Sequence, residues 1–311
     1  QIKRHKLFKM VKQNQFDVII VGGSYAGLSA GMSLGRSLRK VLIIDNGKPC
    51  NEQTPHSQNF LTQDGKTPKE ISTIARQQVE KYSTIEFYEG FTTSGIKTEN
   101  GFEITTENGD KFESKKLIFS TGIVDEIPNI KGFKECWGIS LIHCPYCHGY
   151  EFQNKKTGII ANGDRGFHIA SLVNNLTEDL TIFTRGKANF TDEQFEKLKQ
   201  NNIEIIETEI EELRHQNGMV ENLILSDGKV LNFEAVYGAF PFKQHSDIAE
   251  SLGCELTEMG HIKIDQFQKT NVVGLLACGD NSSPMRSVAN AVYTGNLAGA
   301  MLNAELVGER F

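Results

Sequence analysis

The 311-residue sequence has no long hydrophobic run, no excess of basic residues and no dense set of cysteines. No apolar stretch approaches the roughly 20 residues that a membrane-spanning helix needs. The formal net charge is −6, and charges of both signs are mixed along the chain, whereas nucleic-acid binding usually requires a basic patch. We therefore expect neither a membrane protein nor a nucleic-acid-binding protein.

The N-terminal segment, QIKRHKLFKM, is basic but lacks the apolar stretch of an export signal. We expect residues 1–14 to be a disordered leader or a cloning remnant, and we expect a cytoplasmic location. Only one close pair occurs among the six cysteines, which are Cys50, Cys136, Cys144, Cys147, Cys254 and Cys278. In a reducing compartment, such usage favours a catalytic or metal-binding pair over a framework of structural disulfides.

That pair belongs to the motif CPYC at residues 144–147, which has a histidine on each side. Two cysteines at this spacing can close a small disulfide ring, and its dithiol and disulfide forms differ by two electrons. Disulfide exchange needs a thiolate, and a neighbouring imidazole can act as the base or the electrostatic partner. We predict Cys144 and Cys147 as the redox pair, with His148 and His143 as candidate catalytic histidines.

Three other interpretations of the motif stay open at this point. CPYCH matches the attachment sequence of c-type haem, but haem attachment normally requires export. A structural zinc site normally takes a second ligand pair from elsewhere in the chain, and there is no second C-x-x-C. The cysteines could also form an inert structural pair. We expect redox chemistry and no metal.

A dinucleotide-binding pattern opens the chain. Residues 16–21 (FDVIIV) predict a buried parallel strand, and VGGSYAG leads into a helical stretch. Gly22 provides the tight turn, Ser24 stands where the backbone must approach a pyrophosphate, and Gly27 allows close helix–strand packing. The pyrophosphate would lie at the helix N-terminus. A second strand at 41–44 ends at Asp45, where a carboxylate can accept ribose hydroxyls, so we predict nucleotide binding.

A second such pattern begins at residue 157, directly after the CPYC motif. The strand TGII is followed by ANGDRG, with Gly163 and Gly166 at fingerprint positions, and then by a helix and a strand. No acid stands at the end of that strand, where Arg185 could instead accommodate the 2′-phosphate of NADPH. The alternative is a domain that keeps the fold but no longer binds a nicotinamide cofactor tightly.

Together these segments resemble the low-molecular-weight thioredoxin reductases and their relatives, from Phe16 to about Glu305. VGGSYAG, FSTG at 119–122, the CPYC motif before the second glycine motif, and ACGD at 277–280 stand in family order. The resemblance implies an α/β fold with two Rossmann-like, three-layer ββα domains. The FAD domain would comprise residues 15–125 and 246–311, and the inserted NAD(P)-type domain, residues 126–245, would carry the redox pair.

The resemblance also implies FAD as the cofactor. The FAD contacts would come from Gly22, Ser24, Ala26, Gly27, Asp45, Asn59, Thr121, Gly122, Gly279, Asp280, Ala289 and Asn290. Cys147 would face the flavin, Cys144 would exchange with the substrate, and His148 would shuttle the proton. A swivel between domains and a homodimer are further family expectations. Trp137 and Cys278 are interpreted as core residues.

The chain departs from the reductase pattern in ways that bear on its electron partner. The second domain carries Arg185 but has Phe190 where the reductases have a further arginine for NADPH. His148 replaces an aspartate, and Pro-Tyr replaces Ala-Thr between the cysteines. These changes bring the chain closer to flavin-dependent dithiol oxidases of the gliotoxin and holomycin type, which pass electrons to oxygen.

We therefore predict a flavoprotein that exchanges electrons between FAD and a dithiol or disulfide, with doubtful use of NADPH. The substrate would be a thioredoxin-like protein or a small-molecule dithiol, and a ferredoxin-like protein is an alternative donor. A genuine NADPH-dependent thioredoxin reductase and an oxygen-dependent dithiol oxidase are the two alternatives within this class. A non-catalytic flavin-binding redox sensor is the alternative from another class.

Overall fold

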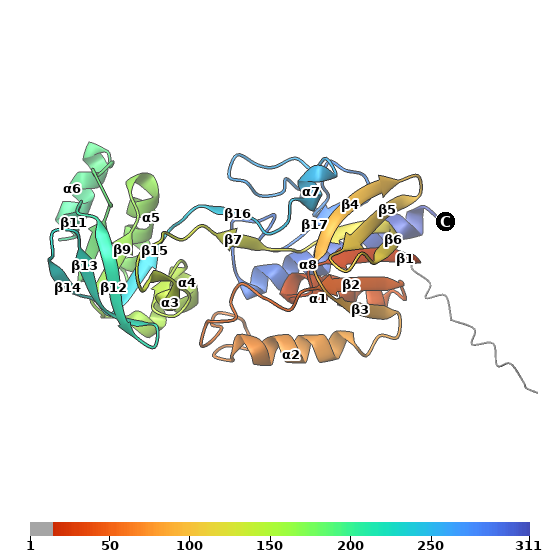
Figure 1. The fold of residues 1–311 in the computed structure, drawn as a ribbon, viewed down its shortest axis with the longest axis horizontal. Coiled ribbons are helices and arrows are strands. Elements are labelled where there is room, and N and C mark those ends of the chain that lie inside the picture. Colours follow the sequence, from red (N-terminus) through yellow and green to blue (C-terminus); the bar gives the residue numbers. More distant parts are fainter. Residues whose placement is uncertain (1–14) are drawn as a thin grey trace, which may run out of the picture.

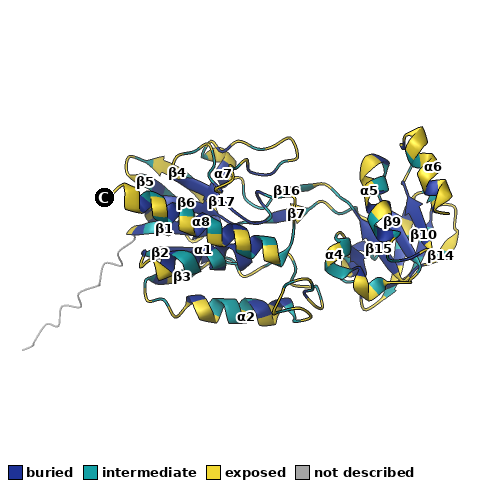
Figure 2. Cartoon of the chain, turned by 180° about the vertical axis from the view of Figure 1, so that it is seen from behind, coloured by how far each residue is buried: buried dark blue, intermediate teal, exposed yellow. Residues whose placement is uncertain are grey.

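The computed structural model describes residues 15–311, and the expected leader at 1–14 lies outside the described residues. Two α/β bodies are joined by a narrow two-stranded ribbon (Figure 1). Buried, apolar strands form the centre of each body, and exposed positions lie on the outward faces of the helices (Figure 2). The predicted α/β class with two Rossmann-like units is confirmed.

The first body is built on a seven-stranded sheet. Its strands are β1 (Gln15–Val21), β2 (Val41–Asp45), β3 (Ile85–Glu89), β4 (Thr92–Thr98), β5 (Gly101–Thr106), β6 (Lys111–Phe119) and β17 (Leu275–Ala277). The order is β3-β2-β1-β6-β5-β4, and β17 pairs with β6. All pairs are parallel except those of the hairpin β4–β5 and of β5 with β6. The carboxyl ends of β1, β2, β6 and β17 therefore meet at one edge, where ligands bind in such sheets.

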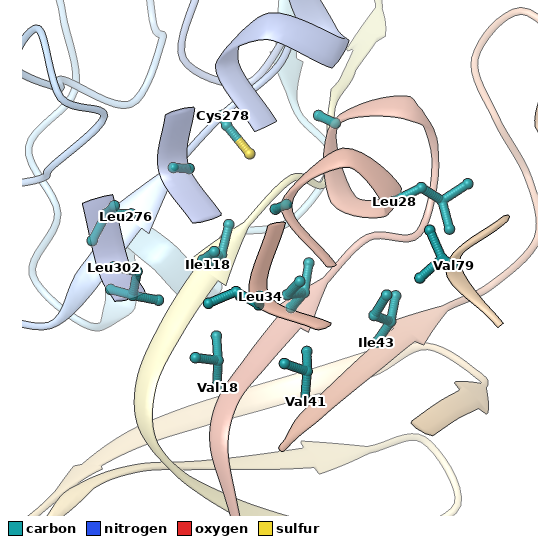
Figure 3. Close-up of a cluster of buried hydrophobic side chains, with 14 of the residues drawn as sticks. Val18, Leu28, Leu34, Val41, Ile43, Val79, Ile118, Leu276, Cys278 and Leu302 are labelled. Carbon is teal, nitrogen blue, oxygen red and sulfur yellow. The ribbon is translucent and has the colours of Figure 1, made fainter. Parts of the chain in front are cut away.

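Helices α1 (Tyr25–Arg36) and α8 (Val288–Gly308) pack together against this sheet, and α2 (Pro68–Val79) lies beside α1 (Figure 1). The Ser29 hydroxyl donates a 2.7 Å hydrogen bond to the Val292 carbonyl between α1 and α8. Figure 3 shows the core beneath them, where strand and helix side chains interdigitate. Cys278 belongs to this core and has no exposed surface, as predicted.

The second body has a parallel five-stranded sheet in the order β11-β10-β9-β15-β8. Its strands are β8 (Leu141–Ile142), β9 (Thr157–Ile160), β10 (Leu180–Phe183), β11 (Glu204–Ile206) and β15 (Ala235–Gly238). One face packs on α5 (Gly163–Val173) and α6 (Asp192–Gln200). The other packs on an antiparallel sheet of β12 (Ile210–Gln216), β13 (Met219–Leu225) and β14 (Val230–Asn232). Short helices are α3 (Phe133–Cys136), α4 (Pro145–His148), the 3₁₀ turn η1 (Tyr150–Phe152) and, in the first body, α7 (Ile248–Ser251).

The ribbon between the bodies consists of β7 (Ile123–Asp125) and β16 (Phe242–Gln244), paired antiparallel (Figure 1). The Gln244 amide donates to the carbonyls of Gly260, at 2.8 Å, and Asn281, at 2.9 Å, which fixes β16 to the first body. Beyond the ribbon, the Phe240 ring packs edge-on against Trp137 of the second body. The chain therefore passes between the two bodies along this ribbon.

No helix among residues 15–311 combines the length and the apolar character that a membrane crossing requires.

Candidate functional site

A cavity of about 840 Å³ lies where the first sheet's strand ends, the ribbon and helix α4 meet. Its size falls within the range of small-molecule and cofactor sites. Both bodies contribute to its wall. The predicted FAD residues that line it are Gly22, Ser24, Ala26, Asp45, Asn59, Thr121, Gly122, Gly279 and Asp280. The structure thus brings together segments that are up to 258 positions apart in the sequence, from Gly22 to Asp280.

The turn after β1 has the geometry that a close backbone approach requires. Gly22 has φ +102°, and a Cβ atom there would lie 2.3 Å from the Ser120 carbonyl oxygen. Gly27 does not line the cavity; a Cβ at Gly27 would lie 1.9 Å from the Gly22 carbonyl oxygen, so only glycine lets α1 approach the turn this closely. Larger side chains at either position would push the helix start away from the strand.

The start of α1 is open towards the cavity. Its N-cap, Ser24, makes no side-chain hydrogen bond to the helix, and Tyr25 and Ala26 in the first turn line the cavity. Asp45 lies at the end of β2 and accepts the Gly23 N–H at 3.0 Å. A helix N-terminus that is not capped by its own side chain can bind an anion through its free N–H groups.

The last helix meets the cavity at Ser287, Val288 and Ala291. The predicted contacts Ala289 and Asn290 belong to the same helical turn but do not line the cavity. The Asn290 amide is bonded instead to the Met285 carbonyl, at 2.8 Å, and to the Ser283 hydroxyl. The cavity is lined by residues next to the two predicted ones, because the rotation of α8 turns Val288 and Ala291 towards it.

The CPYC motif forms the start of α4, directly after β8. A disulfide joins Cys144 and Cys147, whose Cα atoms are 5.3 Å apart. Cys147, His143 and His148 line the cavity, and Cys144 does not. The two sulfurs thus have different surroundings, one towards the cavity and one outside it. No group of three or more His, Cys, Asp or Glu side chains within residues 15–311 is arranged to hold a metal ion.

Both histidines are held neutral by their surroundings. His143 is open to the cavity but enclosed by protein around it, and this loss of water, together with the positive charge of Arg286, lowers its pKa well below the usual value. Enclosure also lowers the pKa of His148, against the opposing effect of Glu151. A neutral imidazole can accept a proton, so either ring is suited to act as a base.

A buried ion pair near the CPYC motif was not predicted from the sequence. The Arg286 guanidinium donates to both carboxylate oxygens of Asp125, at 2.7 and 2.9 Å. Asp280 lies 3.8 Å from Arg286, and burial raises the pKa of Asp280 to about 6 despite that positive charge. The Cys50 thiol also faces the cavity, and the enclosing protein raises its pKa to about 11. Asp125 lies on the ribbon, so this pair ties β7 to the loop before α8.

At the second glycine motif, residues 161–166, polar groups are bonded to side chains of the same body. Asn162 caps α5 and accepts hydrogen bonds from the N–H groups of Gly163 and Asn189, both at 2.8 Å. Gly166 is buried at the helix–strand contact. Arg185 is paired with Glu209 at 3.2 Å. Unlike at the start of α1, the N-cap side chain here already accepts one N–H of the helix start, that of Gly163.

The matches to known proteins extend over nearly the whole chain. A family model described as pyridine nucleotide-disulphide oxidoreductase matches residues 16–295. The thioredoxin reductase tcpT of Claviceps purpurea is 29% identical and covers 96% of this chain and 97% of its own length. The solved oxidoreductase from Agrobacterium tumefaciens is 37% identical, with TM-score 0.88 and coverage of 94% and 99%. The solved structure of HlmI is 28% identical, with TM-score 0.89 and coverage of 96% and 94%. The chain belongs to the pyridine nucleotide-disulphide oxidoreductase family.

Proposed function

We propose that this enzyme passes electrons between FAD and a thiol substrate through the Cys144–Cys147 pair. The observation that carries the proposal is the shared cavity: Cys147 lines the same space as the turn after β1 and the strand ends at Thr121 and Asp280. FAD supplies a two-electron acceptor that thiols can reduce. The protein's part is to hold one sulfur at the cofactor and the other at the substrate.

The residues of the first body suit FAD. The open start of α1 would receive the pyrophosphate, and Asp45 would accept the hydroxyls of the adenosine ribose. Ser24 is small enough to replace a glycine at the closest approach. The start of α8 would lie beside the flavin, with Ser287 and Val288 on the cavity wall.

Asp45→Asn should weaken FAD binding by at least about tenfold. The amide replaces one acceptor oxygen of a carboxylate that also holds the Gly23 N–H, and a hydrogen bond to a charged group is worth about 1.5–3 kcal/mol. Flavin retained after dialysis, followed by fluorescence, measures the effect. Glu89→Gln is the matched control, because Glu89 pairs with Asp45 in the sheet but lies outside the cavity. Equal flavin retention in the two variants would contradict the role of Asp45.

We propose further that NADPH is not the electron donor. Asn162 fills the start of α5, and Arg185 is neutralised by Glu209. Glu207, which accepts the Ala188 N–H at 2.7 Å, adds negative charge at the same strand end. A 2′-phosphate would therefore meet two carboxylates and one arginine that is already paired. Repulsion of this kind disfavours an anionic ligand.

We propose a dithiol substrate as the source of electrons at the pair, and oxygen as the acceptor that we favour. A thioredoxin-like protein or a small-molecule dithiol could reach Cys144, since it lies outside the cavity beside the exposed Tyr146 and Tyr150. A genuine NADPH-dependent thioredoxin reductase, a ferredoxin-like donor and a non-catalytic flavin sensor are outcomes of the test below.

Other features of the proposal have less direct support. The family resemblance supports a homodimer, and the single close cysteine pair supports a cytoplasmic location. The ribbon at β7 and β16 supports domain boundaries at 15–125, 126–245 and 246–311.

Anaerobic mixing of the FAD-loaded protein with NADPH and, separately, with dithiothreitol tests the donor. We expect dithiothreitol to bleach the flavin at least about a hundredfold faster than NADPH, because the lost phosphate contacts are worth several kcal/mol together. Rapid bleaching by NADPH would instead identify a pyridine-nucleotide-dependent reductase. Bleaching by neither reagent would favour the sensor or the ferredoxin-like donor. Peroxide formation in air with a dithiol tests oxygen as the acceptor.

A further inference from the structure

Trp137, the only tryptophan of the chain, lies at the junction of the core and the cavity. It directly follows α3, and its ring is stacked on Phe133 with centroids 6.3 Å apart. The Phe240 ring meets it edge-on at 5.6 Å. The sequence predicted Trp137 as a core residue. In the structure, Trp137 packs on core rings and also lines the cavity.

The indole also contacts the histidine that precedes the redox pair. The ring centroids of Trp137 and His143 are 6.1 Å apart, with an interplanar angle of 34°. Within residues 15–311, this is the only ring contact of His143. The position of the imidazole in the cavity wall therefore depends on the indole.

The residue after Trp137 lies close to the first body. Gly138 has φ +79°, and a Cβ atom there would lie 2.7 Å from the Gln53 amide nitrogen and 3.2 Å from the Thr54 hydroxyl oxygen. The Gly138 N–H donates to the Leu141 carbonyl at 2.8 Å, which closes a turn that leads into β8 and on to His143. Trp137 is thus packed within its own body, and the turn that follows it approaches residues 53–54 of the first body.

Titratable groups from three elements act electrostatically on the imidazole. Arg286 comes from the loop before α8, Asp125 from β7 and His148 from α4. Arg286 and enclosure disfavour the protonated ring of His143, and Asp125 favours it. The ring is neutral near pH 7, and it lines the same cavity as Cys147.

We propose that Trp137 is a positioning residue that holds the His143 imidazole where it accepts the proton of the Cys147 thiol. The inference rests on the proposed function. Oxidation of the dithiol forms the Cys144–Cys147 S–S bond and releases two electrons and two protons. Bound FAD would supply the acceptor for both electrons and one proton, and the His143 imidazole takes up the other proton.

A double-mutant cycle on the FAD-loaded protein tests this, with anaerobic flavin reduction by dithiothreitol as the measured rate. We expect His143→Ala to slow flavin reduction by about a hundredfold, because a general base typically contributes a rate factor of that size. Trp137→Leu should slow flavin reduction by about tenfold. The double variant should be no slower than His143→Ala, because the indole acts only through the imidazole. Trp137→Phe, which keeps an aromatic ring, should recover most of the rate, and Trp137→Leu should shift the pH profile of reduction.

Phe183→Leu is the matched control, since it removes a buried ring of the same body that has no ring contact with Trp137 or His143. Its effect should add to that of His143→Ala. Additive effects of Trp137→Leu and His143→Ala would show that Trp137 acts only on the packing and would overturn the proposal. An unchanged rate in His143→Ala would overturn it too, while leaving the proposed function intact.

Trp137 emission provides a readout that does not depend on turnover. A protonated imidazole next to an indole quenches its fluorescence, and all tryptophan emission comes from this residue. We expect acid quenching in the FAD-loaded protein that is absent in His143→Ala. Identical titrations would mean that the contact is not made. Failure of dithiothreitol to bleach the flavin, with acid quenching present, would locate the failure in the proposed function.

Discussion

Cys147→Ser should bind FAD normally and lose flavin reduction by dithiols by on the order of a thousandfold or more, as expected when the reacting group itself is removed. Cys147 lines the cavity that would hold the flavin, and a serine hydroxyl cannot take part in disulfide exchange. Anaerobic stopped-flow absorbance of the flavin, with dithiothreitol as the donor, measures the loss.

Cys254→Ala is the matched control, because Cys254 is a buried thiol of the first body that lies outside the cavity. Its flavin should be reduced at the rate of the parent protein. If Cys147→Ser were reduced as fast as this control, electrons would reach the flavin without the pair, and the redox motif would have no part in the reaction.

Arg286→Leu should lower the free energy of unfolding by about 3–5 kcal/mol. The substitution leaves Asp125 in a buried site without its bidentate partner; the side chains of the pair are only 18% and 11% exposed. Removing one partner of such a pair leaves an uncompensated charge, which is the costly case. Urea unfolding of the FAD-free protein, followed by circular dichroism, avoids any contribution from cofactor binding.

The comparison variant is Lys131→Leu, which breaks the exposed pair with Glu212. That pair has a lysine side chain 76% exposed, and such pairs contribute at most about 1 kcal/mol. The double variant Asp125→Asn/Arg286→Leu should recover part of the loss, because no unpaired charge remains. Equal stability of Arg286→Leu and Lys131→Leu would mean that the buried pair does not hold the ribbon to the first body.

The two glycine fingerprints and the redox motif could be predicted from the sequence because each is local. The turn at Gly22 and the acid at Asp45 lie within one βαβ unit, so spacing along the chain carries their geometry. The closed second site had a signal that was available: Asn162 is a preferred N-cap residue at the start of a predicted helix. The bond of the Asn162 side chain to the helix start could therefore have been predicted. Its bond to Asn189 could not.

The rest depends on contacts between distant segments. Asp125 and Arg286 are 161 positions apart, and no local pattern in either segment points to the other. The sequence around Trp137 has no pattern that distinguishes a core tryptophan from one that lines a cavity. The rotation of α8 that places Val288, rather than Ala289, at the cavity is set by its packing on α1. Such features follow only from the assembled fold.

The central claim is that the flavin and the Cys144–Cys147 pair form one redox unit. An anaerobic dithiothreitol titration of the FAD-loaded protein tests it most directly, with flavin absorbance read beside mass-spectrometric counting of alkylated Cys144 and Cys147. We predict that the pair and the flavin are reduced over the same range of added dithiol, and that Cys147→Ser keeps its flavin oxidised throughout. Complete flavin bleaching while the Cys144–Cys147 disulfide stays intact would contradict the account.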